Sequence, residues 1–219
     1  MTLSILRDMH RILSAKGPLR GNALAMWAAV LVGFFGMLRK DNLTQGKVNA
    51  VNPLHGLRRG DICFSTSGTG VRIAWLRVRM AKNNPFGERT HLVPLVANGT
   101  MLCPVAALFQ HISDFPAAPE SPVFMCSPAG GRQPVPLSHT AFVSNLKQTL
   151  SAAGLDPSRF AGHSLRRGGA TLAFGLQCPV QLIQLQGDWL SDCVYRYHEV
   201  SSASRLVLPT AMARHVLDE

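Results

Sequence analysis

The sequence has few acidic residues and no long uninterrupted apolar run. Asp and Glu number 12 against 22 Lys and Arg, which gives a formal net charge of +10 and a pI near 10.1. This excess favours an anionic partner, most commonly nucleic acid, although charge alone does not separate DNA from RNA or an acidic membrane. The strongest apolar stretch, residues 23–35, is followed by Arg39 and is shorter than the roughly 20 residues of a membrane span. It therefore predicts a buried core helix.

Paired cysteines, repeats and low-complexity tracts are also missing. The 5 cysteines are scattered and form no Cys-x-x-Cys pair, which argues against a disulfide framework and against a zinc site. We therefore expect a reducing compartment and no bound metal. Residues 1–20 alternate charged and apolar side chains, without the apolar core of a secretory signal. A chain of 219 residues is long enough for one large domain, or for a domain with an appendage.

The residue pattern predicts helices at both ends of the chain and strands between them. Helices are expected over residues 2–15, 18–37, 104–113 and 138–153, from 163 onwards, over 179–187 and from 210 onwards, and strands over 61–65, 71–80 and 90–96. Ser138 suits a helix N-cap, and Pro179 and Pro209 suit the first position of a helix. The strand segments are rich in β-branched and aromatic residues, and residues 83–87 form a turn that makes the last two a hairpin. The segment 115–136, rich in Pro, Gly and Ser, is expected to be a surface loop or linker.

The most informative stretch runs from residue 162 to residue 198. It reads Gly162-His-Ser-Leu-Arg-Arg-Gly-Gly-Ala-Thr171, then Gly187-Asp-Trp-Leu-Ser-Asp192, then Tyr195-Arg-Tyr-His198. His163 and Arg166 are three positions apart, so on a helix they share one face, about 5–6 Å apart at Cβ. Such a pair can grip a phosphate, and a tyrosine hydroxyl can attack phosphorus. The combination suggests phosphoryl transfer through a covalent tyrosine intermediate, with DNA as the substrate.

These motifs resemble those of the tyrosine recombinase (phage integrase) superfamily. The motif sequences are most similar to those of the recombinases of eukaryotic mobile elements of the Crypton and DIRS type. The resemblance runs from roughly residue 31 to residue 198. It implies an α+β fold, mainly α, with a small three-stranded antiparallel sheet. It also implies an enzyme that cleaves and rejoins DNA strands through a 3′-phosphotyrosine intermediate in recombination or integration, without a cofactor or metal.

The resemblance implies five catalytic residues, which are Arg39, Lys82, His163, Arg166 and Tyr197. Arg39 follows Gly36-Met-Leu, like the arginine of the family's Gly-Leu-Arg motif; the other reading is a charge that complements a helix C-terminus. Lys82 precedes the hairpin turn, where the family has a lysine that protonates the departing 5′ oxygen. Arg77 and Arg79 are competing candidates for that proton donor.

The two tyrosines compete for the role of nucleophile. On a helix, residues two apart differ by about 200° in direction, so Tyr195 and Tyr197 cannot both face one phosphate. In the family the tyrosine lies ten residues after the glycine that corresponds to Gly187, and this count selects Tyr197. Tyr195 is then expected to be a packing residue.

Two positions depart from the family's pattern. Asp188 follows Gly187 where a histidine or tryptophan is usual, and Trp189 comes next, so either is an auxiliary candidate for that place. An aspartate that faced the phosphate would repel it. Asn42 stands where an acidic residue usually follows the first arginine, with Asp41 as a stand-in.

We expect residues 1–200 to form the catalytic domain, without the N-terminal core-binding domain of such recombinases, and residues 201–219 to form a C-terminal tail helix. That tail either packs on its own domain or, as often in the family, docks onto a neighbouring protomer. The expected partners are double-stranded DNA and further copies of the chain in a DNA-bound tetramer, with no membrane. The expected location is the nucleus in a eukaryote, or the cytoplasm and nucleoid in a bacterium. The alternative function is a non-catalytic, domesticated or truncated DNA-binding remnant of a mobile element; a topoisomerase-like relaxing activity would share the chemistry.

Overall fold

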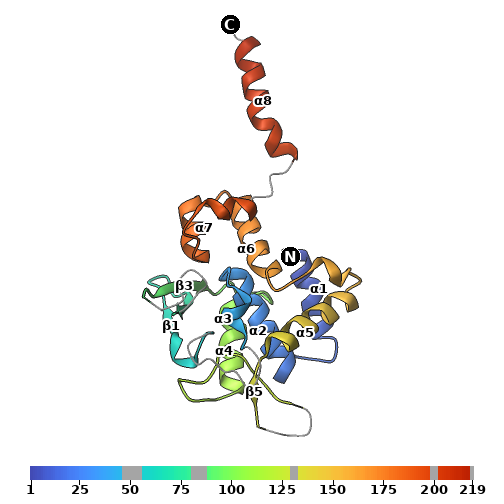
Figure 1. Cartoon of the computed structure of the whole chain (residues 1–219), viewed down its shortest axis with the longest axis vertical. Helices are drawn as coiled ribbons and strands as arrows, with labels where there is room; N and C mark the ends of the chain where they lie inside the picture. Colours follow the sequence, from blue (N-terminus) through green and yellow to red (C-terminus); the bar gives the residue numbers. More distant parts are fainter. Residues whose placement is uncertain (46–55, 80–87, 129–132, 198–201, 218–219) are drawn as a thin grey trace.

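The computed structural model describes residues 1–45, 56–79, 88–128, 133–197 and 202–217. The chain is mainly helical with a small sheet on one side (Figure 1). The α-helices are α1 (Leu3–Leu13), α2 (Gly21–Phe35), α3 (Lys40–Leu43), α4 (Pro104–Asp114), α5 (His139–Ala152), α6 (Ser164–Gly175), α7 (Val180–Gly187) and α8 (Ser202–Leu217). The 3-10 segments are η1 (Arg59–Asp61), η2 (Pro157–Arg159) and η3 (Asp192–Tyr197). The strands are β1 (Ile62–Thr66), β2 (Arg72–Val78), β3 (His91–Val96), β4 (Met125–Cys126) and β5 (Val135–Pro136).

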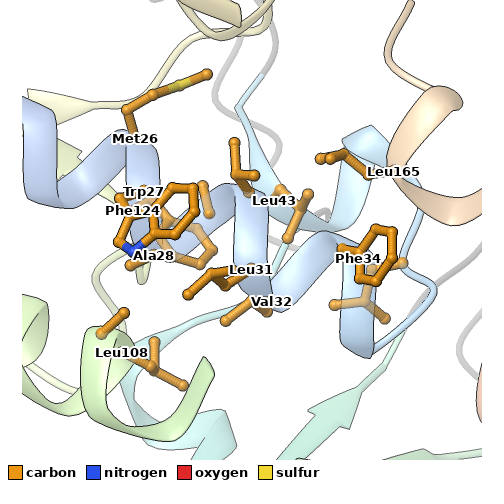
Figure 2. Packing of buried hydrophobic residues seen from close by; sticks show 14 of the residues in the cluster. Met26, Trp27, Ala28, Leu31, Val32, Phe34, Leu43, Leu108, Phe124 and Leu165 are labelled. Carbon is orange, nitrogen blue, oxygen red and sulfur yellow. The ribbon is translucent and has the colours of Figure 1, made fainter. Parts of the chain in front are cut away.

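Helix α2 is the centre of the fold and is apolar around most of its circumference. Every residue from Leu24 to Phe34 is buried, and the helix packs against both α4 and α6. Figure 2 shows how Leu108 and Leu165 meet its side chains from these two neighbours. A helix covered on all sides has no polar stripe, which explains its uniformly apolar sequence. The prediction of a buried core helix over residues 23–35 is confirmed.

The three strands β1, β2 and β3 form an antiparallel sheet in that order. Trp75 in the middle strand pairs with Cys63 on one side and Pro94 on the other. Alternate residues of β2 are buried, as expected for a sheet with one face on the core. The three predicted strands and their antiparallel arrangement are confirmed to within two residues, while the predicted turn at 83–87 lies outside the described residues.

Two predictions about elements were wrong. The segment 115–136 contains a two-stranded ladder of β4 and β5, in which Cys126 pairs with Val135. The segment passes through the interior at Val123 and Phe124, both buried, so its backbone must find hydrogen-bond partners despite its loop-like composition.

The tail helix begins at Ser202 rather than at residue 210, so Pro209 lies inside α8. The serine-rich start of that segment suits a helix N-terminus, and helix-forming residues carry the helix up to the proline.

A second, smaller apolar cluster lies under α6, α7 and η3. It is built from buried Met37, Ala170, Ile183, Trp189 and Val194. Tyr197 packs against this cluster from the end of η3. Beyond it, α8 extends away from the rest of the chain (Figure 1), and its described apolar side chains Leu206, Val207 and Met212 are exposed. Within the described residues, no helix combines the length and the apolar character that a bilayer span requires.

Candidate active site

Arg39 is positioned by an abrupt turn at the end of α2. Met37 takes a left-handed backbone conformation with φ of 48°, and the Leu38 N–H donates to the Gly33 carbonyl at 3.1 Å. This reversal ends the helix and starts α3, for which Arg39 is the N-cap residue. The Arg39 N–H donates to Oδ1 of buried Asn42 at 3.3 Å. Arg39 therefore opens α3, four residues after the last residue of α2.

Arg166 reaches the same turn from the first half of α6. Its side chain is almost fully buried, and Nη1 donates to the Met37 carbonyl oxygen at 2.5 Å. The approach is possible because α6 lies very close to α2: a Cβ added at Gly169 would overlap the Phe34 carbonyl. His163, three residues before Arg166, is the N-cap residue of α6 and is exposed. The structure thus brings Arg39 and Arg166 to one turn, with His163 at the open end of α6.

Trp189 lies beneath Arg166 and beside Tyr197. The guanidinium carbon of Arg166 is 3.7 Å from the centroid of the Trp189 ring, a cation–π contact. The ring centroids of Trp189 and Tyr197 are 5.4 Å apart. The indole folds back over the end of α7, where it would collide with any Cβ at residue 187, so Gly187 is required by this close approach. Trp189 is therefore a buried platform that holds an arginine and a tyrosine.

The two tyrosines have different surroundings. Tyr197 is half-buried, and its backbone carbonyl accepts a hydrogen bond from the Thr171 hydroxyl of α6 at 3.0 Å. Tyr195 is 51% exposed, and its ring centroid is 6.3 Å from that of Phe174. Of the two, only Tyr197 shares the Trp189 platform with Arg166 in the described contacts. The two tyrosines therefore differ in that Tyr197 packs against the indole that also contacts Arg166, whereas Tyr195 is exposed.

Asp188 is buried among the basic residues of the site. Its backbone is left-handed, with φ of 57°, at the C-terminal end of α7. One carboxylate oxygen lies 2.5 Å from Nη2 of Arg89, and the other lies 3.6 Å from Nη1 of Arg39. Asp188 therefore faces the arginines, while Trp189 faces the side chains of Arg166 and Tyr197. Arg89, just before β3, is a site residue that the sequence reasoning missed.

The charges of the site act on one another. Burial, and then the neighbouring charge of Arg39, lower the pKa of the Arg166 guanidinium to about 10, while Tyr197, Asp188 and Cys193 act in the opposite direction. Arg166 is still a cation at neutral pH. Guanidinium groups such as those of Arg39, Arg89 and Arg166 can neutralise the extra negative charge that a phosphodiester acquires when it is attacked. Among the described residues, no group of His, Cys, Asp or Glu is arranged to hold a metal ion.

The predicted proton donor, Lys82, lies outside the described residues. Of its two competitors, Arg77 is exposed on β2, whereas Arg79 is bound through Nε to the buried carboxylate of Asp61 at 2.6 Å. Arg79 is therefore engaged in a structural ion pair.

Asp41 is the candidate for the acidic residue that Asn42 replaces. Its side chain is exposed, and its Oδ1 lies 4.0 Å from Nζ of Lys40.

The sequence matches no protein-family model and no curated protein. Solved structures do match. The XerH site-specific recombinase bound to its difH substrate before cleavage superposes with a TM-score of 0.63 at 14% identity, over 96% of this chain and 53% of that one. A lambda integrase dimer bound to a COC′ core site gives 0.58 at 14% identity, over 94% and 48%. The Flpe recombinase in a Holliday junction complex gives 0.54 at 11% identity, over 90% and 45%.

The chain spans about half the length of each of these proteins. At such low identities the likeness establishes the fold and nothing finer. The chain has the fold of a tyrosine recombinase catalytic domain, mainly helical with a small three-stranded antiparallel sheet, and that predicted fold class is confirmed.

Proposed function

We propose that this protein is a tyrosine recombinase that cleaves and rejoins double-stranded DNA through a 3′-phosphotyrosine intermediate. The observation that carries the proposal is the Trp189 platform. It places the Arg166 guanidinium 3.7 Å above one ring, and Tyr197 packs against that same ring with centroids 5.4 Å apart. The guanidinium that we propose to bind phosphate and the tyrosine that we propose as nucleophile thus pack against one indole, in a fold shared with DNA-bound recombinases.

The proposed reaction assigns a role to each predicted residue. Arg39 and Arg166 bind the non-bridging oxygens of the scissile phosphate, and the Tyr197 hydroxyl oxygen attacks phosphorus. The new P–O bond to tyrosine replaces the P–O5′ bond, and the departing 5′ oxygen takes a proton, for which Lys82 is the proposed donor. His163 assists the proton transfers by accepting the proton that the Tyr197 hydroxyl loses, and it helps to hold the phosphate. Attack by another 5′ hydroxyl reverses these steps and rejoins the strand, so no cofactor is required.

The assembly and origin of the protein belong to the same proposal. We infer a DNA-bound tetramer in which α8 docks onto the neighbouring protomer, supported by the exposure of Leu206, Val207 and Met212 on α8. The residue sequence of the motifs from Gly162 to Tyr197 supports descent from a mobile-element recombinase of the Crypton or DIRS type. We propose residues 1–200 as the catalytic domain, and the nucleus as its location in a eukaryotic host.

A nicked suicide substrate tests the activity. This DNA releases a short fragment on cleavage and so traps the covalent protein–DNA adduct, which is detected by denaturing gel electrophoresis. We expect the wild-type chain to form the adduct. Tyr197→Phe should abolish it and leave DNA binding intact, because only one hydroxyl group is lost, and Tyr195→Phe is the matched control that should retain it. An adduct that persists in Tyr197→Phe and disappears in Tyr195→Phe would assign the nucleophile to Tyr195.

A second candidate is a DNA-binding protein that no longer cleaves. The specific observation in its favour is Asp188, whose carboxylate oxygen lies 3.6 Å from Nη1 of Arg39, one of the two arginines that the first candidate assigns to the phosphate. DNA binding by the wild-type chain without any adduct from the suicide substrate would support this second candidate over the first.

A further inference from the structure

The ion-pair cluster around Asp188 joins three distant parts of the chain. Arg39 comes from the start of α3, Arg89 from the segment before β3, and Asp188 from the end of α7. The Asp188 side chain is 7% exposed, against 20% for Arg39 and 39% for Arg89. A carboxylate this deeply buried is costly unless cations compensate it, so both arginines are held toward it.

The Asp188 carboxylate pairs with Arg39 and Arg89 in the way that a phosphate would. It offers two oxygens and one negative charge, one oxygen directed at each guanidinium. The O–C–O edge of a carboxylate and the O–P–O edge of a phosphodiester are both suited to guanidinium forks. Arg39 is one of the two arginines that the proposed function assigns to the scissile phosphate. In the DNA-free protein, therefore, Asp188 contacts a group that the substrate requires.

Arg89 differs from Asp188 in how far it reaches solvent. Its side chain is more than a third exposed although one of its nitrogens is 2.5 Å from a buried carboxylate oxygen. Carboxylate and phosphate oxygens bind the same planar fork of guanidinium N–H donors, so a phosphate that reached Arg89 from solvent would compete with Asp188 for it. Arg89 thus contacts both the buried Asp188 carboxylate and solvent.

We infer that Arg89 is a third phosphate-binding arginine, and that Asp188 is an internal counterion that holds Arg89 and Arg39 until a DNA phosphate displaces it from them. The inference rests on the proposed function, since it concerns the same site. It assigns Asp188 an unfavourable effect on DNA affinity and a favourable effect on the order of the free site.

The test is equilibrium binding of the full chain to a fluorescein-labelled 30-base-pair duplex, followed by fluorescence anisotropy at several NaCl concentrations. Asp188→Asn is the main variant, because asparagine also tolerates the left-handed backbone at this position. Asp192→Asn is the matched control, since it removes the same charge from an exposed residue four positions away. Arg89→Gln and the Arg89→Gln/Asp188→Asn double variant complete the set.

Asp188→Asn should tighten binding about 5- to 10-fold at 0.1 M NaCl, and the control should tighten it by less than about 3-fold, because its charge is screened by solvent. Arg89→Gln should reduce the slope of log K against log[NaCl] by about 0.9, the change expected for one lost phosphate contact. In the Arg89→Gln background, Asp188→Asn should gain less than it does alone. These three results together support the inference.

Equal tightening by Asp188→Asn and Asp192→Asn would overturn the inference, and so would weaker binding by a folded Asp188→Asn variant, which would make Asp188 a positioning residue. If circular dichroism shows that Asp188→Asn does not fold, the salt slope of Arg89→Gln decides, and an unchanged slope refutes the role of Arg89. The covalent adduct is a separate readout. If a wild-type chain that binds DNA forms no adduct, the proposed cleavage is contradicted. The anisotropy results for the Asp188 and Arg89 variants still decide the present inference, because they measure binding and not cleavage.

Discussion

The close contact between α6 and α2 gives opposite predictions for two glycines of the same helix. A Cβ at Gly169 would overlap the Phe34 carbonyl and lie 3.2 Å from Cγ of Met37, whereas a Cβ at Gly175 would meet nothing within 4 Å. Alanine is favoured over glycine by about 1 kcal/mol in a helix interior, which applies to Gly169, and by somewhat less at Gly175, which is the last residue of α6. At Gly169 the clash involves backbone, which cannot rotate away, so we take the upper part of the usual overpacking cost, about 3 kcal/mol.

Gly169→Ala should therefore destabilise the protein by about 2 kcal/mol, and Gly175→Ala should stabilise it by about 0.5–1 kcal/mol. For a chain of this size the first change corresponds to a fall of about 4–8 °C in Tm. Thermal unfolding followed by circular dichroism measures both variants under identical conditions. Shifts of the same sign and size in both variants would refute the close helix contact, and with it the account of how Arg166 reaches the Met37 carbonyl.

Two further predictions concern His111 and α8. His111 is fully buried, with Nε2 3.1 Å from the Val123 carbonyl oxygen, and burial followed by the charge of Arg59 lowers its pKa from 6.5 to about 4. The unfolded chain takes up this proton below about pH 6.5 and the folded chain only near pH 4, so the free energy of unfolding should fall as the pH drops through that interval, by at most about 3 kcal/mol from this residue. Urea titrations at a series of pH values should show a shallower fall in His111→Gln, and an identical fall would contradict the assignment. Deletion of residues 202–219 should leave single-site DNA binding and Tm nearly unchanged and abolish higher-order complexes on two-site DNA in gel shifts; loss of cooperative melting would show instead that α8 belongs to its own core.

Local patterns predicted most of the secondary structure, because each element carries its own signal. Ser138 caps α5 through a hydrogen bond from the Ala141 N–H at 3.1 Å, as its residue type indicated. The strands were visible from their β-branched residues. Pro179 is predicted as the first helical residue of α7, and in the structure it is the N-cap residue, one position earlier. The prediction for the tail is further from the structure, because a proline can start a helix but at position 209 it lies inside a helix that already begins at Ser202.

The site itself was only partly predictable from sequence. The motif around His163 and Arg166 identified one half of it, because these residues are neighbours on a helix. Arg89 could not be found in this way, since its partner Asp188 lies 99 positions away and an arginine before a strand has no local signature. The role of Trp189 beneath Arg166 likewise depends on how α7 ends against α6. The only sequence signal was the departure from the family's pattern at residues 188 and 189.

The hydrogen bond from Thr171 to the Tyr197 carbonyl has a mechanical consequence. Arg166 and Thr171 lie on the same helix, α6, so the backbone of Tyr197 is tied to the helix that carries Arg166. Arg39 belongs to a different part, the end of α2 and the start of α3. The hydrogen bond from Arg166 to the Met37 carbonyl and the close contact at Gly169 hold these two parts together. The relative position of Arg39, Arg166 and the Tyr197 backbone is therefore set by the packing of α6 on α2.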